Sequence, residues 1–250
     1  MLPVKVDRPP RSTPVITYTL AIINLSVFAI MLVTGTFESA FQNFGLKPSA
    51  VLSGGGIPTL FTSMFLHGGF LHLMFNMWFL LIFGGSVEDV LGWKKFLLFF
   101  IGAGVAAGLI HITFNPASDI PAVGASGAIS SVMGAFIILY PFVRIHAVGE
   151  WSIIKIPAVV YLFFWFILQF LGVAVGWIVA ESEGIAYATH VLSLMGGMGV
   201  AIFVSIRMRR STDCRWFAGD GTCRADGRWC TGKSCENYSP KPPKKAGEFE

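Results

Sequence analysis

Four polar side chains interrupt apolar stretches of the sequence, and their types are those of nucleophilic catalysis. They are Ser126, His190, His72 and Asn76. A histidine that accepts the proton of a serine hydroxyl turns that oxygen into a nucleophile for a carbonyl carbon. His72 and Asn76 are four residues apart, so they share a face of a helix and can donate hydrogen bonds to the oxyanion that forms. The residue types therefore predict a serine nucleophile, a histidine base and two oxyanion donors.

Each of these residues also has a structural interpretation. A serine in a stretch rich in Gly and Ala often bonds its own helix, and an asparagine in a membrane span often joins two helices. Taken singly, the structural interpretation is favoured for each. Polar groups inside a membrane span are, however, functional candidates, and the four types together favour a catalytic site.

The composition indicates that membrane helices position these residues. The chain has 250 residues, of which 54% are hydrophobic and 13% are charged, and its mean hydropathy is +0.68. Soluble domains carry about 25% charged residues, so a soluble or disordered chain is disfavoured. The net charge of +4 gives no sign of a nucleic-acid surface. Apolar runs predict an all-α membrane protein, a bundle of six transmembrane helices at 16–35, 61–83, 96–114, 122–142, 153–179 and 185–206.

Three segments follow from this pattern: an N-terminal segment at 1–15, a membrane domain at 16–206 and a tail at 207–250. The loops 36–60, 115–121 and 180–184 together hold a single Lys, Lys47, whereas the other side holds many Lys and Arg. Because cytoplasmic loops carry the excess of Lys and Arg, we expect a multi-pass protein of the cell membrane with both termini in the cytoplasm.

This topology places the catalytic candidates at one depth. The second, fourth and sixth spans all run from the outside to the inside. Ser126 and His190 each lie about five residues inside the outer end of a span, and His72 lies slightly deeper. We therefore expect one layer of polar groups just below the outer surface.

The tail carries all four cysteines, Cys214, Cys223, Cys230 and Cys235. Their spacing matches no strong zinc pattern, and a reducing compartment disfavours disulfides. Free thiols are the favoured interpretation, and a small zinc site is the alternative.

The same residues resemble the rhomboid family of intramembrane serine proteases. The resemblance covers roughly residues 16–205. It rests on the stretch HGGFLHLMFN, which begins at His67 and holds His72 and Asn76, and on GASG, in which Gly124 and Gly127 surround Ser126. It further rests on the G-x-x-x-E-x-x-x-G segment of Gly84, Glu88 and Gly92, and on His190 followed by Gly197.

The resemblance implies a Ser126–His190 dyad that needs no metal or cofactor, with His72 and Asn76 stabilising the oxyanion. It implies that Glu88 holds the loop 36–60 by hydrogen bonds. The expected partners are the lipid bilayer and transmembrane protein substrates, cleaved within or near their spanning segments. The alternative is a non-catalytic membrane chaperone or adaptor that binds client helices on the same fold.

Overall fold

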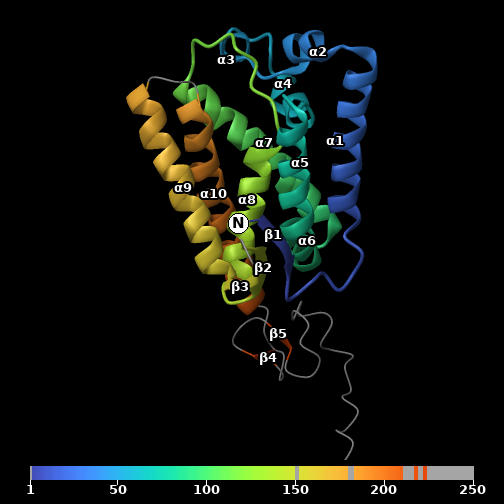
Figure 1. Cartoon of the computed structure of the whole chain (residues 1–250), viewed down its shortest axis with the longest axis vertical. Helices are drawn as coiled ribbons and strands as arrows, with labels where there is room; N and C mark the ends of the chain where they lie inside the picture. Colours follow the sequence, from blue (N-terminus) through green and yellow to red (C-terminus); the bar gives the residue numbers. More distant parts are fainter. Residues whose placement is uncertain (1, 150–151, 180–182, 211–216, 219–221, 224–250) are drawn as a thin grey trace, which may run out of the picture. The chain divides into compact units, whose positions relative to one another are not determined.

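The computed structural model describes residues 2–149, 152–179, 183–210, 217–218 and 222–223. It divides into two compact units, Met1–Ala201 and Ile202–Glu250. The helices are α1 Val15–Thr34, α2 Phe37–Phe44, α3 Pro48–Leu52, α4 Thr59–Thr62, a 3-10 turn Ser63–Phe65, α5 Phe70–Phe79, a π turn Leu80–Gly84, α6 Gly85–Leu91, α7 Trp93–Phe114, α8 Ser126–Leu139, α9 Ala158–Val179 and α10 Glu183–Arg210 (Figure 1). The strands are β1 Leu2–Val6, β2 Arg144–Val148, β3 Ile153–Pro157, β4 Phe217–Ala218 and β5 Thr222–Cys223.

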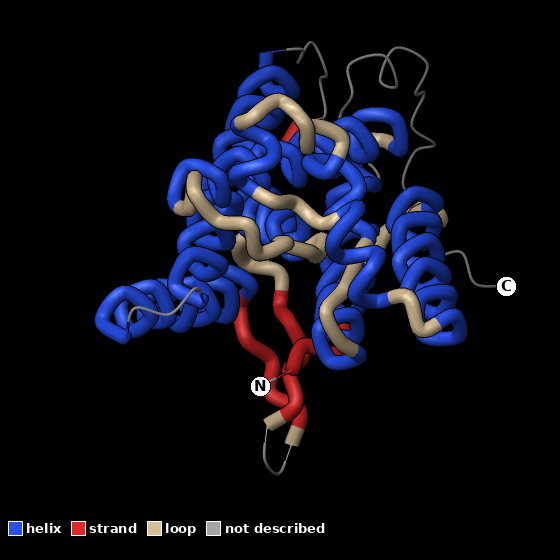
Figure 2. The backbone as a smooth tube through the Cα atoms, turned by 90° about the horizontal axis from the view of Figure 1, so that it is seen from above, coloured by secondary structure: helices blue, strands red, loops and turns tan. Residues whose placement is uncertain are grey.

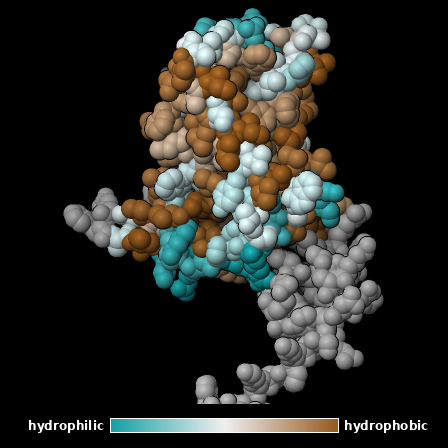
Figure 3. Space-filling model, turned by 90° about the vertical axis from the view of Figure 1, so that its right-hand side faces the viewer, coloured by the Kyte–Doolittle hydropathy of each residue, from teal (hydrophilic) through white to brown (hydrophobic). Residues whose placement is uncertain are grey.

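Several helices are built to cross a membrane. Within the described residues, four are long and apolar enough by length and composition: Val15–Thr34, Phe70–Leu91, Trp93–Phe114 and Tyr187–Ile206. Two shorter apolar helices, Ser126–Leu139 and Ala158–Leu171, accompany them. Hydrophobic side chains form a broad band across the face shown in Figure 3, with hydrophilic residues above and below it. A multi-pass membrane protein follows, and the count of six spans stays a prediction.

Three predicted spans begin later than the hydropathy suggested. The second begins at Phe70 instead of residue 61, because Gly68 and Gly69 follow the short α4 and the 3-10 turn and interrupt the helix. The fourth begins at Ser126, after an extended stretch that contains Pro121. The fifth begins at Ala158, because residues 153–157 form a strand.

A small antiparallel sheet departs from the all-helical expectation. Its order is β1-β2-β3, so the N-terminal segment pairs with the chain between α8 and α9. The three central residues of β2, Ile145, His146 and Ala147, are buried, and its end residues Arg144 and Val148 are exposed. The sheet projects from the helices when the molecule is seen from above (Figure 2).

Helix α8 occupies the centre of the first unit, and it carries the predicted nucleophile. After Ser126 nearly every one of its side chains is buried. Small residues at Gly127 and Gly134 let neighbouring helices approach closely. A Cβ on Gly127 would overlap Ala107 of α7, and one on Gly134 would overlap the backbone of Leu194 in α10.

Candidate active site

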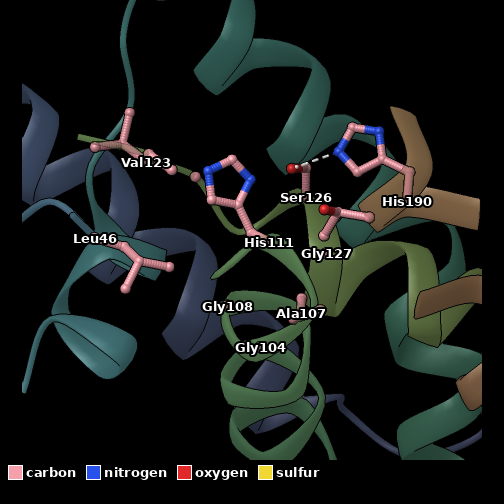
Figure 4. A pocket seen from close by; sticks show the side chains of 13 residues that line it. Leu46, Gly104, Ala107, Gly108, His111, Val123, Ser126, Gly127 and His190 are labelled. Carbon is pink, nitrogen blue, oxygen red and sulfur yellow. Dashed lines mark hydrogen bonds between the residues drawn. The ribbon is translucent and has the colours of Figure 1, made fainter. Parts of the chain in front are cut away.

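Ser126 and His190 are joined by a hydrogen bond. The Ser126 Oγ lies 2.8 Å from the Nε2 of His190 (Figure 4). Ser126 is the first residue of α8, so it lies at the helix end and not five residues inside a span as expected. His190 stands in α10, and both side chains are half-buried. The structure thus brings the two residues together at the distance that proton transfer requires.

The two helices that carry these residues, α8 and α10, are in close contact. The Ser131 Oγ of α8 donates a hydrogen bond of 2.8 Å to the backbone carbonyl of Ser193 in α10. A Cβ on Gly197 would overlap the carbonyl oxygen of Ser131. Only a glycine at position 197 therefore allows the two backbones to lie this close.

His72 and Asn76 lie beside the pair, in one cavity with both members. The cavity, of about 210 Å³, is lined among others by His72, Asn76, Ser126 and His190. The Asn76 Nδ2 donates a hydrogen bond of 2.8 Å to the carbonyl oxygen of His72, one turn earlier in the helix, and this bond uses one of its two hydrogens. The Asn76 side chain is 6% exposed. The second amide hydrogen of Asn76 is not used by this bond.

Gly124 makes room for the His72 ring. Its φ is +125°, a backbone conformation that side-chain-bearing residues rarely adopt. A Cβ on Gly124 would also lie 2.9 Å from the Cε1 and Nε2 atoms of His72. Position 124 therefore requires a glycine, both for its backbone conformation and for the space that the His72 ring occupies. The Gly124 N–H donates a hydrogen bond of 2.9 Å to the carbonyl oxygen of Ser63, which fixes the turn before Ser126.

His67 supports His72 from outside the helix. It lies in the turn before α5 and is completely buried. Its ring meets the ring of His72 edge-on, with centroids 5.2 Å apart. Within the described residues, neither ring nitrogen of His67 has a hydrogen-bond partner. The contact limits the orientations open to the His72 ring.

Glu88 does not hold the loop 36–60, so that expectation is wrong. Its carboxylate accepts hydrogen bonds from the backbone N–H groups of Ile16 and Thr17 at 2.9 and 2.8 Å. It therefore caps the first turn of α1. Gly84 of the same motif packs on Thr17, where a Cβ would lie 3.1 Å from the threonine side chain. Gly92, at φ +76°, ends α6 and begins α7.

The loop 36–60 is instead fastened to the segment before Ser126. Leu46 and Ala122 exchange two backbone hydrogen bonds of 2.9 Å. Ser49 bonds the carbonyl of Ser118 through its N–H, and its hydroxyl donates to the carboxylate of Asp119. The loop and the turn that presents the nucleophile are therefore one connected structure.

Two residues near the pair were missed in the sequence. Gln169 of α9 places its Oε1 3.2 Å from the Nδ1 of His190. His111 of α7 lines a second cavity of about 210 Å³, which Ser126 and His190 also line. In Figure 4 the His111 side chain lies on the other side of Ser126 from His190. Both are polar residues within apolar helices, the signal that identified the other candidates.

Most of the cysteine-containing tail lies outside the described residues. Cys214, Cys230 and Cys235 lie outside the described residues, and Cys223 lies in the short strand β5. Within the described part of the chain, no group of three or more His, Cys, Asp or Glu residues could hold a metal ion. Free thiols and a zinc site both stay open for the tail.

Comparison with known proteins agrees with the geometry. A family model described as "Rhomboid domain" matches residues 54–207. Rhomboid protease GluP of Bacillus subtilis (strain 168) is 32% identical over 126 residues, which cover 50% of this chain and 24% of the relative. The putative rhomboid protease YdcA of the same organism is 35% identical over 91 residues, 36% of this chain and 45% of the relative.

A plant relative aligns over more of the chain. RHOMBOID-like protein 6, mitochondrial, of Arabidopsis thaliana is 26% identical over 195 residues, 64% of this chain and 60% of the relative. The chain thus spans less than two thirds of the length of each of these relatives. The family match covers more than half of the chain and includes Ser126 and His190, so the chain belongs to the rhomboid family.

Proposed function

We propose that this protein is an intramembrane serine endopeptidase that uses a Ser126–His190 dyad. The observation that carries the proposal is the 2.8 Å hydrogen bond between Ser126 Oγ and His190 Nε2. Membership of the family, and relatives whose names describe them as proteases, support it.

The dyad would work in two halves. His190 Nε2 takes the hydroxyl proton of Ser126 while the oxygen attacks the scissile carbonyl carbon. The tetrahedral intermediate collapses to an acyl-enzyme as the peptide C–N bond breaks, and His190 passes its proton to the leaving amine. Water then attacks the ester, again through His190, and releases the second fragment and the free serine.

The oxyanion would form where donors are already concentrated. Ser126 begins α8, so its backbone N–H belongs to the first turn, which has no acceptor within the helix and lies at the positive end of the helix dipole. His72 and Asn76 face the same cavity from α5. One amide hydrogen of Asn76 is held by its own helix, which fixes the amide for use of the other.

The cavity walls suit a segment drawn from a membrane. Beside the polar groups, the cavity is lined by Phe75, Phe79, Met133 and Trp165, which offer apolar surface to apolar side chains. We therefore propose transmembrane proteins as substrates, cleaved within or near their spanning segments.

Cleavage of a membrane-anchored reporter tests the proposal. Ser126→Ala and His190→Ala should each lower the rate by about 10⁶, and the double variant should be little worse, because the two residues act as a unit. Ser130→Ala makes the same change one turn along α8, at a hydroxyl bonded to the Ser126 carbonyl, and should keep most of the activity.

Thermal unfolding in detergent should show that all variants are folded. Wild-type cleavage by the Ser126→Ala variant, with contaminating protease excluded, would contradict the dyad. Reporter binding without cleavage by the wild-type protein would favour the chaperone or adaptor.

A further inference from the structure

Helix α9 presents one polar side chain to the catalytic pair. The described side chains on either side of Gln169 turn outward, since Leu168 is 50% exposed and Phe170 is 56% exposed. Gln169 is half-buried and lines the cavity that also holds Ser126 and His190. A polar side chain that faces the interior of an apolar helix bundle indicates function or a specific bond.

Gln169 bonds the ring nitrogen of His190 that does not contact Ser126. Gln169 Oε1 lies 3.2 Å from Nδ1 of His190, while Nε2 of the same ring lies 2.8 Å from Ser126 Oγ. Among the described residues, these two hydrogen bonds are the ones found at the His190 ring. Three side chains from three helices thus form a line in which His190 is central.

A carbonyl oxygen accepts a hydrogen bond and cannot donate one. It therefore favours the neutral tautomer of His190 with the hydrogen on Nδ1, which leaves the lone pair on Nε2. That lone pair is what must accept the proton of Ser126. In the opposite tautomer Nε2 carries a hydrogen and cannot act as the base.

We propose that Gln169 is a positioning residue that fixes the tautomer and the ring orientation of His190. This inference rests on the proposed protease function. When Nε2 gains the serine proton, the Nδ1–H stays in place and Gln169 accepts from the imidazolium as it did from the neutral ring. No proton moves to the amide, and the proton balance of the dyad is unchanged.

An amide suits this position better than a carboxylate. A carboxylate buried among apolar helices needs a partner charge or many donors, and its desolvation costs several kcal/mol. A glutamine supplies the same acceptor oxygen without a charge. Its neutral acceptor stabilises an imidazolium less strongly than a carboxylate would, so we expect an orienting effect that is smaller than that of a buried aspartate.

The kinetic test compares two variants of nearly equal size. Gln169→Met keeps the length of the side chain and removes the acceptor, so kcat should fall by about 10- to 100-fold with little change in KM. Gln169→Glu keeps an acceptor oxygen and should recover most of that loss. Phe170→Leu, at the exposed next position, is the matched control and should leave both constants near wild type.

These measurements separate positioning from other roles. Equal kcat for Gln169→Met and wild type would overturn the proposal. A raised KM with unchanged kcat would also overturn it, because it would place Gln169 in substrate binding. If the wild-type protein does not cleave, it is the proposed function that fails.

A spectroscopic readout needs no activity. In protein labelled with ¹⁵N-histidine, the resonances of His190 are assigned by their loss in His190→Gln. The wild-type ring should show a protonated Nδ1 and an unprotonated Nε2, and Gln169→Met should yield a mixture of tautomers. A wild-type ring protonated at Nε2 would overturn the proposal even where the protease function stands.

Discussion

Glu88 and Thr17, 71 positions apart, are joined by two hydrogen bonds of 2.8 Å, from the backbone N–H and from the hydroxyl of Thr17. A third, of 2.9 Å, comes from the N–H of Ile16. The carboxylate is 4% exposed and lies at the first turn of α1, where a negative charge is favoured by the helix dipole. This contact fastens the first turn of α1 to α6, and the two helices are labelled in Figure 1.

Glu88→Ala should therefore act on stability. It leaves two backbone N–H groups and a hydroxyl without their acceptor, which costs about 1–3 kcal/mol when such groups are buried. We expect a lower melting temperature in detergent. The kcat of the folded fraction should stay near wild type, because no atom of the dyad contacts this carboxylate.

Asp89→Ala is the matched control. Asp89 is the next residue and bonds Ser12 in an exposed position, so its loss should change the melting temperature little. A fall in kcat for Glu88→Ala without a fall in melting temperature would contradict the structural role.

The catalytic candidates could be predicted because lipid makes polar groups conspicuous. Ser126 and His190 interrupt apolar stretches, and the structure places them in hydrogen-bond contact. Gln169 interrupts α9 in the same way and could have been found by the same signal. The hydrogen-bond partner of Glu88 could not be predicted in this way. A buried carboxylate can accept hydrogen bonds from any backbone N–H group that lacks an acceptor, and only the packing of α1 against α6 determines that these are the N–H groups at the start of α1.

The helix limits and the sheet were harder to predict for a different reason. Hydropathy measures apolar content and does not distinguish a strand from a helix. Residues 153–157 are mostly apolar, so the fifth predicted span includes them although they form β3. Their pairing with β2, and that of β2 with β1, joins segments that are remote in sequence. Short strands of this kind depend on tertiary contacts more than on local preference.

Asn76→Ala should lower kcat by about 10²–10³, the usual effect of removing one oxyanion donor while others remain. Asn24→Ala is a matched control, because Asn24 is also buried and also donates to the carbonyl one turn earlier in its helix, at 2.7 Å. Loss of that bond in α1 should affect the melting temperature only. An equal loss of kcat in both variants would mean that Asn76 has a structural role in helix packing and is not an oxyanion donor.

The sheet should weaken in acid. The hydrogen bond from His146 lowers the pKa of Asp7 below its ordinary value of 3.8. Because the folded pKa is the lower one, the stabilisation is complete above the unfolded pKa and is lost as pH falls through the folded pKa. Hydrogen exchange of β1 should therefore separate wild type from Asp7→Asn at pH 6. A difference that persists at pH 2 would contradict this linkage.

The orientation of the chain can be tested with thiol labelling. Ser53 is exposed in the loop 36–60, and the positive-inside pattern places that loop outside. An impermeant maleimide should label Ser53→Cys in intact cells. The native tail thiols serve as the internal control, because they should react only after lysis. Labelling with the opposite pattern would reverse the proposed topology.

Gly197 offers the sharpest test of how the fold positions the dyad. A Cβ at this position would overlap the Ser131 carbonyl oxygen of α8, whereas a Cβ on its neighbour Gly196 would meet no atom within 4 Å. Gly197→Ala must therefore push α10 away from α8, and His190 with it. Overpacking of this kind costs about 1–3 kcal/mol.

A displacement of about 1 Å at a reacting pair can cost about 10² in rate. We therefore expect Gly197→Ala to lower both melting temperature and kcat, and Gly196→Ala to lower neither. Both variants add one methyl group to the same helix, so differences in helix preference cancel between them. The measurement is reporter cleavage by the folded fraction, at a temperature where each variant remains folded. Equal kcat for the two variants would mean that the α8–α10 contact does not set the distance between Ser126 and His190.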